Sequence, residues 1–381
     1  MKSWAAIVCF AATLAAVPAS RAPASDGKVP SERIDALVRD LGSDKFATRE
    51  QASRRLRELG IVTRESLERA ASDPDAEVRL RARSILAEVR ASDFEARVAR
   101  FLADNEGSGD NSLPAWAAFS ERFGSSRLVR ELFVEMHRSE PALLEAMADG
   151  TESASAALDE CTREILDAHL ESQMDLGTLA SLLFVGSDED ITVDERRGVQ
   201  LYPYVVHSTY RHHYNSPLWT AVLKKLVADW LVRESTPLVA NQNLIFAAQL
   251  ELRPEALEIS KRVLAEKDTP TNTRVVAIRI IGHFNGTAEL AAVEKQLSDA
   301  TTCAKTEEPQ SAETQVRDVA LLILLRGTGQ EPGAYGCEAA SLQENILVQT
   351  DQPIFLDDAR RQAALQKWKL WREENPQAFE D

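Results

Sequence analysis

The residues best suited to chemistry are histidines in a short stretch that is also rich in tyrosine. His207, His212 and His213 are half of the chain's six histidines, and four of its five tyrosines lie between residues 202 and 214. Zinc and copper sites need imidazole nitrogens that converge on one point about 2 Å away. On a helix, spacings of five and six residues would turn His207 away from the other two, and no H-E-x-x-H motif is present. These histidines are therefore candidates for a metal site, and solvent-facing imidazoles are the alternative.

In the stretch just before these histidines, acidic residues occupy alternate positions, as they do in a calcium-binding loop. Asp188, Asp190 and Asp194 occupy alternate positions, but Val193 and Val199 stand where an EF-hand needs glycine and glutamate. The stretch is therefore expected to be a solvated loop. The sequence also lacks a G-x-S-x-G elbow, a phosphate-binding glycine loop, G-x-G-x-x-G and C-x-x-C. We predict no catalytic residue and no cofactor.

Three cysteines lie beyond the N-terminal segment. Cys303 and Cys337 are expected in loops on either side of a helix over 315–326, and the sequence predicts a disulfide between them. Closing that loop would stabilise the fold by about 3–4 kcal/mol, whereas free thiols are the alternative. Cys161 is expected to be a buried free thiol on a helix, because His169 lies two turns away, too far to activate it.

The N-terminal segment has the pattern of a secretory signal peptide. Lys2 precedes an uncharged run over residues 4–17, and small residues follow it, with cleavage expected near Ala19 or Ala22. The run of about 14 residues is shorter than the roughly 20 that span a membrane, although an uncleaved anchor is the alternative. The sequence predicts a secreted or periplasmic protein that has no membrane contact after cleavage.

The charge balance excludes some partners. The chain has 44 basic and 60 acidic residues and a net charge of −16, which becomes −18 if Lys2 and Arg21 are removed. Nucleic acids and anionic membranes need a clustered positive field, so neither is expected as a partner. With 44% hydrophobic and 27% charged residues, the chain is expected to fold into a globular structure.

The elements that would position these residues are almost all helical. Apolar residues recur with the helical period, and the breaks between stripes are two to four residues long, which predicts an all-α protein of antiparallel neighbouring helices. An R-x-x-A-x-x-x-(L/I) pattern occurs twice at an offset of 30, from Arg49 to Arg79, and returns twice later in the chain. In such a pattern the alanine allows close packing, and the arginine can reach an acidic or carbonyl group of the adjacent repeat. The pattern begins at Arg49, Arg79, Arg274 and Arg317.

The stretch over 73–79, Asp-Pro-Asp-Ala-Glu-Val-Arg, resembles the turn and helix start of HEAT repeats. Residues 41–60, 315–337 and 363–371 are also similar to secreted bacterial HEAT-repeat proteins of the kind found in planctomycetes. The resemblance implies a HEAT-like α-solenoid of stacked antiparallel helix pairs and a binding role, and it brings no catalytic residues. An irregular all-α domain is the alternative.

The predicted organisation has a less regular centre between two repeat regions. We expect a signal peptide (1–22), a linker (23–30), N-terminal HEAT-like repeats (31–90), a helical middle region (91–235) with an irregular insertion (186–217), C-terminal repeats (236–330), and a loop with a capping helix (331–381). The capping helix is expected over 358–374 and presents Leu365, Trp368 and Trp371.

The leading functional hypothesis is an exported non-catalytic scaffold that binds a protein or peptide partner. The sequence does not identify that partner or the oligomeric state. The alternative hypothesis is a metal-binding protein or enzyme with its site within residues 202–214.

Overall fold

The computed structural model describes residues 30–104, 113–167, 174–192, 195–213, 218, 222–233, 239–306, 311–338 and 353–379. The expected signal peptide and the linker up to residue 29 lie outside the described residues. The chain forms two compact units, residues 1–97 and 98–381, and each is described by itself. In the described part of the chain, no helix is both long and apolar enough to cross a membrane.

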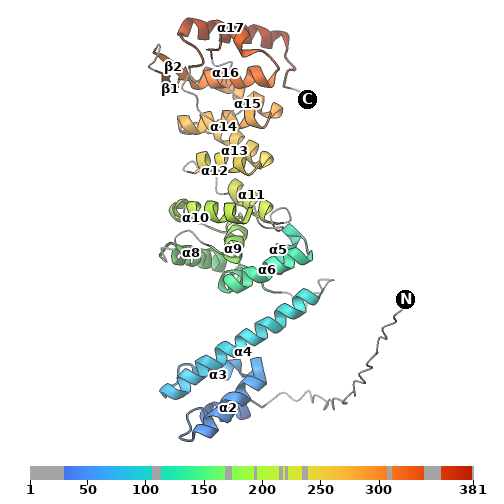
Figure 1. Ribbon diagram of the computed structural model, residues 1–381, viewed down its shortest axis with the longest axis vertical. Helices are drawn as coiled ribbons and strands as arrows, with labels where there is room; N and C mark the ends of the chain where they lie inside the picture. Colours follow the sequence, from blue (N-terminus) through green and yellow to red (C-terminus); the bar gives the residue numbers. More distant parts are fainter. Residues whose placement is uncertain are drawn as a thin grey trace, which may run out of the picture. The chain divides into compact units, whose positions relative to one another are not determined.

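The first unit is built from helices (Figure 1) that pack around one aliphatic core. They are α1 (Ser31–Asp40), α2 (Phe46–Leu59), the 3-10 turn η1 (Gly60–Thr63), α3 (Arg64–Ala70) and α4 (Ala76–Ala103) up to Arg97, after which the second unit begins. Asp75 starts α4, because its carboxylate accepts the Glu77 and Val78 amides at 2.8 and 3.4 Å. α4 runs without a break past residue 90, the expected end of the N-terminal repeats.

The repeated sequence pattern lies at the packing positions of this unit. Ala52 and Ala82 are 2% and 0% exposed, which lets α2 and α4 approach their neighbours closely. Arg49 and Arg79 donate to the carbonyls of Ser43 and Asp73, six residues before them in each case, at 2.7 and 2.6 Å. Arg49 also reaches the carboxylate of Glu77 in the following helix pair, 3.3 Å away, which is the kind of contact that the pattern predicts.

The second unit is also predominantly helical. Its elements are α5 (Trp116–Phe123), α6 (Arg127–Ser139), α7 (Pro141–Asp149), α8 (Thr151–Asp167), α9 (Leu176–Gly186), α10 (Glu195–His213), α11 (Lys224–Arg233), α12 (Ala240–Gln249), α13 (Arg253–Ala265), α14 (Thr271–His283), η4 (Thr287–Glu289), α15 (Leu290–Glu294), η5 (Lys295–Ser298), β1 (Thr302–Thr306), β2 (Ala312–Gln315), α16 (Val316–Gly327), η6 (Pro332–Tyr335) and α17 (Asp358–Glu374).

Helices of the second unit pack against both the next helix and the next but one. α12 contacts α13 and α14, α14 contacts α16, and α11 contacts α9 and α13. Figure 1 shows these helices following one another in sequence order. A helix such as α12 therefore packs against the next helix in the chain and also against the one after it.

Contacts between successive helix pairs recur at nearly constant sequence separation in both units. Hydrogen-bonded residues 31 apart are Asp35–Ser66, Glu50–Arg81 and Arg57–Glu88, and separations of 30 and 32 are found for Val232–Arg262 and Leu264–Gln296. These separations are close to the offset of 30 in the sequence pattern.

Aromatic side chains form the core near the start of the second unit. Phe101 packs edge-on against Trp116 with ring centroids 4.8 Å apart, and Phe133 lies 5.2 Å from the same ring. Phe119 joins this cluster to Phe184 of α9 at 5.0 Å. The fully buried rings join α4, α5, α6 and α9 around one centre.

Two segments differ from the sequence-based expectation. Residues 302–315 hold an antiparallel hairpin, in which Ala304 pairs with Thr314 and an irregularity lies next to Thr302; threonine-rich segments favour this extended geometry. The predicted irregular insertion over 186–217 is largely α10. Its buried stripe of Leu201, Val205 and Thr209 follows the helical period, but a hydroxyl and the internal Pro203 obscured the pattern.

The last helix, α17, has the predicted bounds and is anchored by a buried ion pair. The Arg361 guanidinium lies 2.7 Å from the Asp318 carboxylate, and their side chains are 5% and 1% exposed. Asp318 also caps α16 by accepting the Gln315 amide at 2.8 Å. Trp368 is buried, whereas Leu365 is partly exposed. One carboxylate therefore fixes both the start of α16 and the position of α17.

Candidate functional site: two grooves in the second unit

His207 and His212, the two candidate histidines whose side chains the structure describes, belong to no metal-ligand cluster among the described residues. His207 is exposed on α10, and His212 is half-buried one helical turn further on, where burial lowers its pKa. The side chain of His213 lies outside the described residues. Among the residues that the structure describes, no three His, Cys, Asp or Glu side chains gather as a metal site requires.

The tyrosines beside these histidines pack against neighbouring helices. The Tyr202 ring stacks on Trp230 of α11 at 6.1 Å, and Tyr210 lies edge-on to Phe246 of α12 at 5.3 Å. The Tyr210 hydroxyl donates to the Gln249 side chain. Their described contacts are those of packing between helices.

The predicted disulfide between Cys303 and Cys337 is not formed, since both are free thiols. Cys303 lies in strand β1 and not in a loop, and its Sγ donates to the Thr314 carbonyl across the hairpin at 3.3 Å. Burial raises the pKa of Cys303 to about 11 and that of Cys337 to about 12. The thiolate that oxidation requires is therefore disfavoured at both positions.

Cys161 is a buried free thiol on α8, as the sequence predicts. Its Sγ donates to the Glu140 carboxylate at 3.4 Å, and Thr178 donates to the other carboxylate oxygen at 2.7 Å. Burial is the main cause that raises the pKa of Cys161, and the charge of Glu140 adds to it. This is a packing position and not that of an activated nucleophile.

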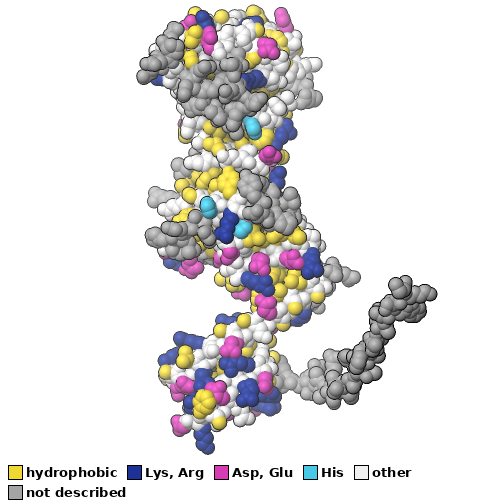
Figure 2. Space-filling model, in the orientation of Figure 1, with side chains coloured by type: hydrophobic (Ala, Val, Ile, Leu, Met, Phe, Trp, Pro, Cys, Tyr) yellow, Lys and Arg dark blue, Asp and Glu magenta, His cyan; other side chains and the backbone are white. Residues whose placement is uncertain are grey.

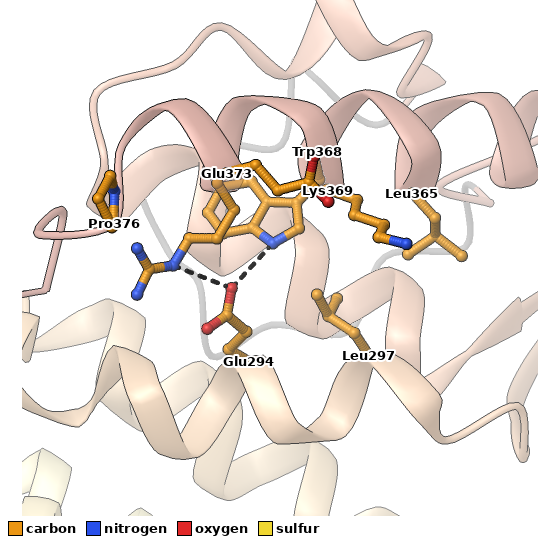
Figure 3. Close-up of a pocket in the computed structure, with 8 residues that line it drawn as sticks. Glu294, Leu297, Leu365, Trp368, Lys369, Glu373 and Pro376 are labelled. Atoms are coloured by element: carbon orange, nitrogen blue, oxygen red, sulfur yellow. Dashed lines mark hydrogen bonds and ion pairs between the residues drawn. The ribbon is translucent and has the colours of Figure 1, made fainter.

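The first groove lies between α17 and the α15–η5 segment and has a volume of about 660 Å³. Leu297 and Leu365 line its apolar side together with Trp368 (Figure 3). Glu294 accepts the Trp368 indole N–H at 3.2 Å and pairs with Arg372 at 3.3 Å. Because Glu294 already binds both groups, the groove presents mainly an apolar surface with charged side chains at its edge.

The second groove is larger, about 840 Å³, and is lined mainly by charged side chains. It receives Arg122 from α5; Ser187, Asp188 and Glu189 after α9; Ala228, Asp229, Val232 and Arg233 from α11; and Glu255, Glu258 and Arg262 from α13. We call it the acidic groove, because five of these side chains are carboxylates and three are guanidinium groups.

The arginines of the acidic groove are held by groups of the protein itself. Arg122 pairs with Asp229 at 2.9 Å and donates to the Ser187 hydroxyl at 2.7 Å. Arg233 donates to the Ile191 carbonyl at 3.3 Å, and Arg262 to the Val232 carbonyl at 3.1 Å. These contacts join the ends of α5, α9, α11 and α13, so the guanidinium groups have a structural role.

Neither groove could be recognised from the sequence. Arg122 and Asp229 are 107 residues apart, and the lining residues of the acidic groove come from four helices whose mutual packing the sequence pattern does not specify. The only sequence feature that pointed to the acidic groove was the acidic run at 188–190, which was expected to be a solvated loop.

Comparison with known proteins gives no relative for this chain: no family model matches it, and no curated protein or solved structure does so either.

Proposed function

We propose that this chain is an exported, non-catalytic helical-repeat scaffold, a HEAT-like α-solenoid that binds a protein or peptide partner. The main support is the recurrence of contacts between helix pairs at separations of 30 to 32 residues in both units. A stack of this kind exposes one surface that crosses several repeats, and such surfaces bind extended partners. Export is supported by the pattern of Lys2 and the following apolar run.

The described chemistry agrees with a binding role. The two grooves are open to solvent at the surface, and their charged groups are engaged mainly in holding helices together. Burial raises the pKa values of the three thiols. These features favour recognition of a surface over turnover of a small substrate.

The test is site-specific photo-crosslinking of the full chain in the cells that produce it. A photoreactive amino acid is placed at exposed positions on α11 and α13, and in a control set on α7 and α8. We expect the protein in the extracytoplasmic fraction, shortened at its N-terminus, with one discrete protein adduct from the first set. The adduct must re-form from the two purified proteins. Retention in the cytosol, or no adduct from either set, would contradict the proposal.

A further inference from the structure

The acidic groove crosses three helices that follow one another in the packing order. α11 contacts both α9 and α13, and the groove takes lining residues from α11, from α13 and from the turn that ends α9. A segment lying in this groove would therefore touch successive helix pairs at once, as an extended ligand on a repeat array does.

Two of the three positive charges of the groove are compensated by carboxylates. Arg122 faces Asp229, and Arg262 lies 3.5 Å from Glu258. Arg233 binds main-chain carbonyls and has no carboxylate partner among the described residues. In the part of the chain that the structure describes, Asp188, Glu189 and Glu255 form no ion pair, so three carboxylates face the groove beside one guanidinium group that lacks a countercharge.

A second source of negative potential is independent of these side chains. α5, α9 and α11 end at Phe123, Gly186 and Arg233, so three helix C-termini meet at the groove. The unpaired carbonyls of a helix C-terminus carry partial negative charge and favour cations. Lys225 and Arg262 already bind carbonyls at these ends, at 2.7 and 3.1 Å. The cationic side chains of the protein therefore already bind some of the carbonyls at these helix C-termini.

We propose that the acidic groove binds an extended segment of the partner protein through its lysine or arginine side chains, an inference that rests on the proposed function. The carboxylates of Asp188, Glu189 and Glu255 would accept charge-assisted hydrogen bonds from ammonium or guanidinium groups. The surrounding unit strengthens this complementarity, because residues 98–381 hold 45 acidic and 27 basic residues. The field of such a surface speeds association with a basic partner and makes binding sensitive to salt.

The probe is a short dye-labelled peptide of alternating lysine and glycine, titrated with the purified mature chain by fluorescence anisotropy. We expect binding at low salt that weakens steadily as sodium chloride is added, and none with the glutamate–glycine counterpart. The triple variant D188N/E189Q/E255Q should lose about tenfold in affinity, since each exposed pair contributes a fraction of a kcal/mol.

A matched control removes the same charge elsewhere in the same unit. The variant E145Q/D149N/E152Q changes three exposed carboxylates of α7 and α8 and should change the affinity by less than about twofold. Circular dichroism of both variants checks that they melt as the parent does. Equal losses in the two triple variants, or no binding of the lysine peptide at all, would overturn the proposal.

The crosslinking experiment separates this inference from the function on which it rests. If a partner adduct forms and the lysine peptide competes with it, both stand. If the adduct forms and excess lysine peptide does not compete, the scaffold function stands and the acidic groove is not the contact. If no adduct forms from any position, the scaffold function fails as well.

Discussion

The two units are both predominantly helical but differ in the side chains that join their helices. In residues 31–97, 14 basic and 14 acidic residues balance, and the surface carries both signs side by side (Figure 2). Inter-pair contacts there are exposed ion pairs such as Arg57–Glu88 and Arg81–Glu50. The second unit has a large acidic excess, an aromatic core and a buried ion pair. Helices in the two units are therefore joined by different kinds of polar and aromatic contact.

The difference can be measured directly, because the aromatic probes are divided between the units. Residues 31–97 contain no Trp, Tyr or Cys, whereas the second unit holds every Trp except Trp4. Tryptophan fluorescence thus reports the second unit alone, and circular dichroism reports both. A comparison of the two signals separates the responses of the units to salt, acid and mutation.

The largest effect is expected from removing the buried charge that anchors α17. Asp318→Ala leaves Arg361 buried without its carboxylate and also removes the cap of α16. Breaking one side of a buried pair costs about 3–5 kcal/mol. Urea unfolding followed by tryptophan fluorescence should show this loss, with Arg360→Ala as the exposed control. A loss below about 1 kcal/mol would mean that the ion pair does not anchor the helix.

A smaller effect is expected where α9 approaches α6 most closely. A Cβ atom at Gly177 would lie 2.3 Å from the Glu135 carbonyl oxygen and from Ser139 Oγ. Because main chain cannot yield as a flexible side chain does, Gly177→Ala should cost about 1–3 kcal/mol. At Gly282 the nearest atoms belong to the Ile323 side chain, so Gly282→Ala is the milder matched control. The order of the two losses in tryptophan-detected unfolding is the result to compare.

Acid should affect the first unit while the tryptophan core is still intact. Hydrogen bonds from Arg64 and Arg90 hold the pKa of Glu68 below its ordinary value of 4.5, and one from Arg57 does so for Glu88. A depressed folded-state pKa adds stability above the ordinary pKa, and that stability is lost as the pH falls through the folded value. Below about pH 4.5, helical ellipticity should therefore fall before tryptophan fluorescence changes. Coincident transitions would contradict a difference between the units.

The smallest effect is expected for one surface pair of the first unit. A double-mutant cycle on Arg57 and Glu88, with both changed to alanine, should give a coupling of about 0.2–1 kcal/mol, since the side chains are 40% and 50% exposed. The coupling should vanish in high salt. A coupling that persists in 1 M sodium chloride would show that packing and not charge joins these helices.

The sequence was sufficient to predict the helical class and the packing positions, but not the grooves. Ala52, Ala82, Ala277 and Ala320 were assigned to close packing from their spacing alone, and all four are buried. Spacing works for such positions because a helix fixes which residues share a face. It failed for α10, whose buried stripe is partly made of hydroxyl side chains.

The acidic groove and the state of the cysteines depend on contacts that the chain pattern does not encode. Arg122 meets Asp229 only because α5 and α11 both pack beside α9. Cys303 lies in a hairpin that interrupts the helical order, so reasoning from flanking loops misplaced it. Local periodicity predicts which face of an element is buried. Contacts between residues far apart in the sequence depend instead on how several elements pack against one another.

The way in which α17 is attached has a consequence for substitutions elsewhere in the fold. Of its described polar partners, Asp318, Glu294 and the Ala334 carbonyl lie in the segment from α15 to η6, and Glu338, which pairs with Arg360, follows shortly after η6. The contacts that hold α17 therefore lie close to it in the sequence, so a substitution in α12 or α13 should leave the attachment of this helix unchanged.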